Sequence, residues 1–439
     1  MQADKTTLYD LSIFHPEEEQ SAFHHLNFTK TVGGKDWLRL LLSRPLNSLQ
    51  EIRDTQNIIR SLIKLLPDWP QTISNGTIMV IEKYYDSQIE TLPVHPNAVN
   101  SFFYKTINGP DYSLTKYSVE HFIHFTQGMN KIVSLFQSLN DLPLSLSVMT
   151  ERIIQLLNRS KDTGAFEVTD PKKLSRIESL RYGQFFRRHF KNQAVELIDI
   201  FCKLDAYQSL AAATVQYDLV FPEFIKSEQP LFAAKELYHI LLKEAVSYNV
   251  DLQQEKNFLF LTGANMAGKS TFIKAVGLSA FLAHVGMTVP ARSLQLTRFD
   301  GLLSNIHVSD NIIKGESYFF NEVQRIRKTI EKISDGKKWL ILIDELFKGT
   351  NIQDAMKCST VVIEGLRKMD NALFILSTHL YEIGEDLKKY QNIQFKYFET
   401  KVNEDQLEFN YRLQEGISND RLGYLILKRE GVVDMLQKL

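Results

Sequence analysis

The feature that most constrains this chain is an eight-residue run, Gly263 to Ser270, which satisfies the pattern GxxxxGK[ST]. An apolar stretch, Phe258 to Leu261, precedes the run, and a segment with helical apolar spacing follows it. A strand, a glycine-rich turn and a helix in this order direct the backbone amides at the helix start toward a phosphate. A chance glycine loop is the alternative, and the strand and helix on its two sides argue against it. The sequence therefore predicts a P-loop nucleotide site.

Each residue type in the run has a physical role in holding a nucleotide. Gly263 and Gly268 let the backbone turn so that its amides point inward. Lys269 brings positive charge to the β- and γ-phosphates, and Ser270 offers a hydroxyl to Mg²⁺. The guanine-reading sequence Asn-Lys-x-Asp does not occur in the chain, so ATP is the expected nucleotide. The predicted ATP-binding residues are Gly263, Ala264, Asn265, Met266, Ala267, Gly268, Lys269, Ser270 and Thr271.

Two further apolar runs end in polar side chains that would complete a hydrolytic site. The run 339–343 is followed by Asp344 and Glu345, about 75 residues after the P-loop, and a third run ends just before His379. We expect Asp344 to bind Mg²⁺, Glu345 to polarise the attacking water and His379 to reach the γ-phosphate. Taken singly, an acid at a strand end or a lone histidine is more often structural. In combination they predict an ATPase with Glu345, His379 and Lys269 as its catalytic residues.

The pattern of apolar residues divides the chain into two parts. With 439 residues the chain exceeds the usual size of one domain. From about Leu8 to Gln216 helical spacing predominates, whereas after Tyr217 short strand-like runs alternate with helical segments. The predicted fold class is α + α/β, with an all-helical domain over 1–216. A P-loop NTPase domain with a mainly parallel sheet and C-terminal helices follows over 217–439.

Composition excludes several classes of protein. Hydrophobic residues make up 44% of the chain and charged residues 23%, which is usual for a globular protein. The two cysteines, Cys202 and Cys358, form neither a disulfide framework nor a structural zinc set, which favours a reducing compartment. The N-terminus lacks the features of a signal peptide, and no apolar run is long enough to span a bilayer. The expected location is cytoplasmic, with no membrane partner and Mg²⁺ as the only expected metal.

The motifs together resemble the ATPase domain of the MutS DNA mismatch-repair family, a branch of the ABC-type ATPases that act as dimers. The resemblance also covers the first half of the chain, which is similar to the family's helical core, or lever, domain. The similar segments are 23–46, 203–217, TGANMAGKSTF at 262–272, HVGMTVPARS at 284–293, SDNIIKGESYFFNEV at 309–323, LIDELFKGTNIQDA at 342–355 and STHLYEI at 377–383.

The resemblance implies a function and one further site residue. By analogy Ser317 is the signature serine that reaches the γ-phosphate of ATP held by a partner subunit, although by sequence alone it is an ordinary serine. A homodimer through the ATPase domain would then hydrolyse ATP, with Mg²⁺, in composite sites. The implied function is an ATP-dependent DNA-binding protein that makes clamp-like movements on DNA, in mismatch repair or in recognition of branched or damaged DNA.

The chain also departs from the family pattern. We expect it to begin at the helical core, without the N-terminal domain that recognises mismatches. Residues 221–223 match the family's Phe-x-Glu wedge in letters but lie where the family has a linker, so we interpret them as structural. Phe320 and Asn321 differ from the usual signature segment, and Phe347 and Lys348 replace a Gly-Arg pair after the catalytic acid.

A basic segment is the candidate contact with DNA. Residues 172–191 carry a local charge of +6 with interleaved aromatic residues, although the whole chain has a formal charge of only −1. A solvated helix face over core aromatics explains the same pattern. The alternative function is therefore an ATP-gated dimer that acts on a protein or ribosomal partner without recognising DNA. The residues predicted to contact double-stranded or branched DNA are Arg176, Arg181, Arg187, Arg188 and Lys191.

Overall fold

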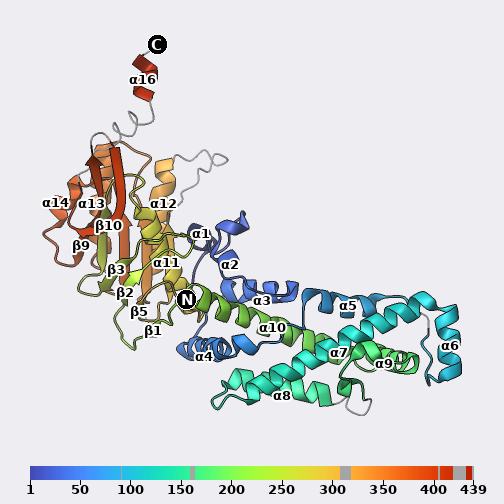
Figure 1. Ribbon diagram of the computed structural model, residues 1–439. Coiled ribbons are helices and arrows are strands. Elements are labelled where there is room, and N and C mark those ends of the chain that lie inside the picture. Colours follow the sequence, from blue (N-terminus) through green and yellow to red (C-terminus); the bar gives the residue numbers. More distant parts are fainter. Residues whose placement is uncertain (90, 159–163, 307–317, 404–405, 419–431, 438–439) are drawn as a thin grey trace. The chain divides into compact units, whose positions relative to one another are not determined.

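The computed structural model describes residues 1–89, 91–158, 164–306, 318–403, 406–418 and 432–437. Contacts divide the chain into a sheet unit (1–25, 44–52 and 216–439) and a helical unit (26–43 and 53–215). Figure 1 shows both units. The division into domains 1–216 and 217–439 stays a prediction, and the structure adds that the first 25 residues belong to the sheet unit. Within the ranges given above, no helix has the length and apolar character needed to cross a bilayer.

A six-stranded sheet forms the centre of the sheet unit. Its strand order is β10-β9-β4-β8-β7-β6, and every pair is parallel except β9 with β10. The three apolar runs predicted to be strands are confirmed as β4, β8 and β7, and they lie next to one another. The strands are β4 (Phe258–Thr262), β6 (Gly301–Asn305), β7 (Trp339–Asp344), β8 (Ala372–Ser377), β9 (Ile393–Asn403) and β10 (Gln406–Glu415).

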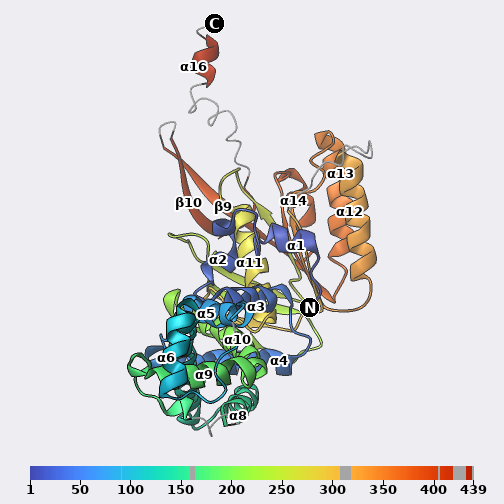
Figure 2. The same cartoon turned by 90° about the vertical axis from the view of Figure 1, so that its right-hand side faces the viewer.

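Helices cover both faces of this sheet. On one face Gly277 of α11 lies so close to Leu342 of β7 that a Cβ on the glycine would be 2.5 Å from a Leu342 methyl. On the other face Trp339, Ile341 and Ile343 belong to one buried cluster with residues of α12, α13 and α14. In Figure 2, α12 and α13 lie side by side. The helices of this unit are α1 (Lys5–Asp10), α2 (Ala22–His25), α11 (Lys269–His284), α12 (Tyr318–Ile333), α13 (Ile352–Leu366), α14 (Glu382–Leu387) and α16 (Val432–Gln437).

A smaller sheet and the N-terminal residues complete this unit. The small sheet has the order β1-β5-β2-β3. The N-terminus extends the edge of the large sheet, because Gln2 pairs with Gly301 of β6 and α1 packs on that strand. The strands of the small sheet are β1 (Glu223–Phe224), β2 (Leu231–Leu237), β3 (Tyr248–Gln253) and β5 (Ser293–Leu296).

The helical unit is built around the long helix α7, which contacts α5, α6, α8 and α9. The described part of this unit contains no strand, as the sequence predicted. Side chains cap the starts of α5, α6 and α9, as in the capping box of Ser175 and Glu178 at α9. The helices are α3 (Val32–Ser43), α4 (Leu49–Leu65), α5 (Asn75–Asp86), α6 (Ala98–Ile107), α7 (Gly109–Gln137), α8 (Leu144–Asn158), α9 (Arg176–Arg188) and α10 (Lys191–Gln216).

Aromatic side chains hold α7 and α9 together. Phe122 and Phe186 stack with ring centroids 4.4 Å apart, and both are fully buried. Gly183 of α9 allows the close approach, because a Cβ there would lie 2.2 Å from a methyl of Thr115. The fold class predicted from the sequence, a helical body plus a P-loop α/β unit with a mainly parallel sheet, is confirmed.

A buried histidine at the end of α11 gives the fold a measurable protonation state. His284 is completely buried; its Nδ1 lies 2.7 Å from the carbonyl oxygen of Ala280, and its Nε2 lies 2.9 Å from the backbone nitrogen of Phe299. Since the carbonyl can only accept and the amide can only donate, Nδ1 carries the proton and Nε2 is unprotonated. Burial lowers the pKa of His284 to about 3.

We expect His284 to stay neutral in the folded protein at pH 5. An unfolded histidine takes up a proton below about pH 6.5. The stability that His284 contributes is therefore complete above that pH and is lost as the pH falls toward about 3. Ring ¹⁵N shifts, assigned with a His284→Gln variant, measure this state directly. Titration of this ring near pH 6.5 in the folded protein would contradict the assignment.

Candidate functional site

The order of the strands brings the predicted site residues to one edge of the large sheet. The P-loop follows β4, Asp344 and Glu345 end β7, and His379 follows β8, which lies between the other two strands. Backbone hydrogen bonds continue past the strands, since the amide of Glu345 donates to the Ser377 carbonyl at 2.9 Å. The convergence predicted from three separate motifs is therefore present.

The P-loop has the backbone of a tight turn. Gly263 (φ 138°) and Gly268 (φ 108°) have positive φ, as expected of glycines at such a turn. Met266 also has a positive φ of 66°, which is unusual for a residue with a side chain. Ala264 and Ala267 are buried, whereas the side chains of Asn265 and Met266 are exposed. Gly268 caps α11, whose first residues include Ser270 and Thr271.

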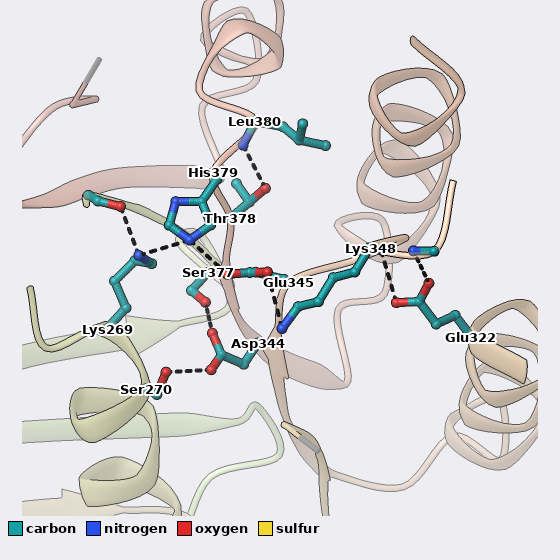
Figure 3. A network of polar contacts seen from close by, with 12 residues as sticks. Lys269, Ser270, Glu322, Asp344, Glu345, Lys348, Ser377, Thr378, His379 and Leu380 are labelled. Carbon is teal, nitrogen blue, oxygen red and sulfur yellow. Dashed lines mark hydrogen bonds and ion pairs between the residues drawn. The ribbon is translucent and has the colours of Figure 1, made fainter. Parts of the chain in front are cut away.

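Lys269 is a buried cation that folds back onto its own loop (Figure 3). Its Nζ donates to the carbonyl oxygens of Gly263 at 2.8 Å and Ala264 at 2.9 Å. Burial lowers the pKa of Lys269 to about 8, against the opposite effect of the carboxylates of Glu345 and Asp344. A cation kept at this point, with carbonyls as its main partners, is ready to exchange them for phosphate oxygens.

Asp344, at the end of β7, is connected to the start of α11 and to the end of β8 through two hydroxyls. The Ser270 hydroxyl donates to one of its carboxylate oxygens at 2.5 Å, and the Ser377 hydroxyl donates to the other. The side chain is almost fully buried. The role of Ser377 was not predicted from the sequence, although its place between a buried strand and His379 is a signal that could have found it.

Glu345 is paired on both carboxylate oxygens. Oε1 lies 2.8 Å from Nε2 of His379, and Oε2 lies 3.1 Å from Nζ of Lys348 (Figure 3). Burial by itself raises the pKa of the Glu345 carboxyl, but the hydrogen bond from His379 and the charge of Lys348 outweigh it, and the pKa falls to about 2. Nε2 of His379 also lies 3.5 Å from Nζ of Lys269; a nitrogen that donates to Glu345 has no lone pair left to accept from the lysine.

A cavity of about 420 Å³ opens over the P-loop. Beside the P-loop and Glu345, its lining includes Tyr248 from β3 and Tyr411 from β10, together with Leu242 and Val246. Two aromatic rings and aliphatic side chains next to a phosphate loop suit a flat, apolar base. Sequence reasoning missed these residues, because they come from strands far from the motif.

The residues present fit both ATP and Mg²⁺. The cavity is lined by the P-loop, one buried lysine and apolar side chains, and its volume lies in the usual range for small-molecule sites. The hydroxyl of Ser270 and the carboxylate of Asp344 are oxygen donors, which Mg²⁺ prefers, and they already lie in contact.

Comparisons with known proteins agree with this geometry. The family model described as MutS domain V matches residues 259–435. Of the ATP-site residues named above, only Leu242, Val246 and Tyr248 lie before the matched segment. Over these residues the chain is similar to the MutS family.

Individual MutS relatives match a larger part of the chain. A DNA mismatch repair protein MutS of Pseudothermotoga lettingae is 29% identical over 52% of this chain and 28% of its own length. The MutS of Thermotoga maritima is 27% identical over 61% of this chain and 34% of its own length. DNA mismatch repair protein MSH3 of Candida glabrata is 29% identical over 65% of this chain and 28% of its own length. The chain thus matches about a third or less of the length of these relatives.

Ser317, the serine implied by the MutS resemblance, lies outside the described residues. The helix that follows it, α12, begins at Tyr318. The role of Ser317 stays a prediction.

The cations of the basic segment differ in their contacts. The guanidinium of Arg187 is hydrogen-bonded within the helical unit: it donates to the carbonyls of Tyr84 and Ser87 at the end of α5, each at 2.5 Å. Arg181 donates to the hydroxyl of Tyr182 at 3.1 Å. Arg181 is nevertheless exposed at the surface, as are Arg188, Arg176, whose guanidinium lies over the ring of Phe102, and Lys191, whose ammonium lies over that of Tyr85.

We expect Arg187 to contribute to stability and Arg188 not to do so. Arg187→Ala removes charged hydrogen bonds to two carbonyls at a helix end, which is worth about 2–4 kcal/mol in the free energy of unfolding. Arg188→Ala changes an exposed side chain, and we expect an effect within about 0.5 kcal/mol. Urea unfolding followed by circular dichroism compares the two; equal effects would contradict the division between internal and surface cations.

Proposed function

We propose that this chain is a Mg²⁺-dependent ATPase of the MutS type. One observation carries the proposal: Lys269, Ser270 and Glu345 line one cavity at the ends of neighbouring strands, where Ser270 is paired with Asp344 and Glu345 with His379. Phosphate-loop chemistry needs a cation for the β- and γ-phosphates, oxygen ligands for a metal and a group that orients water. The similarity to MutS domain V supports the same activity.

The contacts within the site suggest how hydrolysis proceeds. Lys269 would leave the carbonyls of Gly263 and Ala264 for the phosphates of ATP. Bound Mg²⁺, held by Ser270 and Asp344, would neutralise phosphate charge. Glu345 would orient the attacking water, which requires that Oε2 release Lys348, while His379 would remain close enough to reach the γ-phosphate.

We further propose that the active form is a homodimer. By the MutS resemblance Ser317 completes the site of a second copy, so that ATP is held between two ATPase domains. The relatives named above are DNA mismatch repair proteins, and with the exposed cations of α9 and the start of α10 they favour DNA, double-stranded or branched, as the partner. Contacts from Arg176, Arg181, Arg188 and Lys191 would be to the backbone, without recognition of bases.

ATP turnover tests the catalytic assignment. We expect Glu345→Gln to lower the rate of phosphate release at least 100-fold while ATP still binds, because the group that orients water is lost. Lys269→Ala should instead weaken ATP binding by about 10-fold or more, since a charge-assisted contact disappears. Glu385→Gln, whose side chain is exposed and pairs with Lys388, is the matched control and should behave as wild type. Equal phosphate release by wild type and Glu345→Gln would refute the assignment.

DNA binding tests the partner. In fluorescence anisotropy with homoduplex, mismatched and four-way DNA, with and without ATP, we expect affinity to fall steeply with salt. Arg188→Ala should weaken binding several-fold on every DNA and lower the salt slope by about 1. Arg327→Ala, an exposed arginine of α12, is the control and should have no effect. If the chain shows no salt-sensitive binding to any of these DNAs, the proposed DNA partner is wrong, and a protein or ribosomal partner is favoured.

A further inference from the structure

The first turn of α12 packs on the loop that follows Glu345. Ring centroids of Phe319 in α12 and Phe347 in the loop are 5.7 Å apart. Phe347 is buried, and both side chains belong to the cluster between the sheet and its covering helices. The helix that begins one residue after Ser317 is thus in direct contact with the segment that carries Glu345.

A buried carboxylate strengthens this contact. Glu322, one turn further along α12, is only 5% exposed. Its Oε1 accepts from the backbone amide of Lys348 at 3.2 Å, and its Oε2 accepts from that of Gly349 at 3.2 Å (Figure 3). Burial of a carboxylate is costly unless it is hydrogen-bonded, so the position of Glu322 requires these amides to stay where they are.

The loop held by Glu322 has an unfavourable backbone. Glu345 has φ 61° and Phe347 has φ 60°, in the left-handed region that residues with side chains seldom occupy. Such conformations persist only where the surrounding structure fixes them. The two hydrogen bonds from backbone amides to Glu322 and the ring contact of Phe319 are contacts that α12 supplies to this loop.

Another side chain of α12 is fixed to the sheet. Arg325 donates to the carbonyl oxygen of Ser304 in β6 at 3.1 Å and lies 3.8 Å from the buried carboxylate of Asp10. One side of the helix start is therefore attached to β6 and another to the Glu345 loop. A change in the position of this helix start would be transmitted to the loop.

We propose that Glu322 is a positioning residue: it ties the start of α12 to the Lys348–Gly349 backbone and so sets the position of Glu345. This proposal rests on the proposed function, because Glu345 is the residue taken to orient the attacking water and Ser317 the one taken to reach a second copy's ATP. Glu322 would thereby couple the serine that a chain contributes to its partner's site with the acid in its own.

Hydrogen exchange and turnover together test this role. Glu322→Gln keeps the size of the side chain but places an NH₂ group against a backbone N–H. We expect exchange of the Lys348 and Gly349 amides to rise about 10- to 100-fold, the range for loss of a charged hydrogen bond. ATP-analogue affinity should stay within about two-fold, since the P-loop is not altered, whereas kcat should fall about 10-fold or more. Glu331→Gln, an exposed acid of the same helix paired with Arg327, is the matched control and should change none of these.

Three results would overturn the proposal. Unchanged exchange at Lys348 and Gly349 would mean that Glu322 does not hold the loop. A rise throughout the sheet unit would mean that it acts on stability alone. A local rise with unchanged kcat would mean that the held loop does not position Glu345. If wild type itself releases no phosphate, the proposed ATPase function fails, and the exchange result still decides whether Glu322 fixes the loop.

Discussion

The site depends on the hydrogen bonds of the Asp344 carboxylate. It accepts one from the hydroxyl of Ser270, at the start of α11, and one from the hydroxyl of Ser377, at the end of β8. Because β4, β8 and β7 are parallel neighbours, one short acid at the end of β7 can bridge the P-loop and the segment that leads to His379. Parallel strands bring their carboxyl ends to a single edge, which makes this meeting of distant segments possible.

The charged side chains of the site have hydrogen-bonding or ionic partners within the chain. Lys269 has loop carbonyls as its close partners, and Glu345 has His379 and Lys348. Ion pairs and charged hydrogen bonds of this kind reduce the cost of burying charge before a nucleotide arrives. The same contacts must be exchanged for hydrolysis, so binding of ATP has to supply the free energy that releases Lys269 from the loop and Glu345 from Lys348.

Local sequence predicted the parts of the structure that local physics decides. The three apolar runs were correctly predicted as strands β4, β7 and β8, because each run is short and continuously apolar, as a strand buried on both faces must be. The long hairpin β9–β10 was missed, and with it Tyr411, which lies in an irregular stretch of β10 with φ 53° and lines the cavity. The use of Arg187 inside the helical unit was missed as well, since its carbonyl partners lie about 100 residues away.

The central claim is that one ATP site is completed by residues of two chains. The most direct measurement mixes a Lys269→Ala chain, whose own P-loop is impaired in binding and hydrolysing ATP, with a Ser317→Ala chain, which lacks the contributed serine. Each variant alone should release little phosphate, whereas random pairing should restore about a quarter of the wild-type rate, because half of the dimers contain one complete site. A mixture no more active than the two variants measured separately would contradict the account.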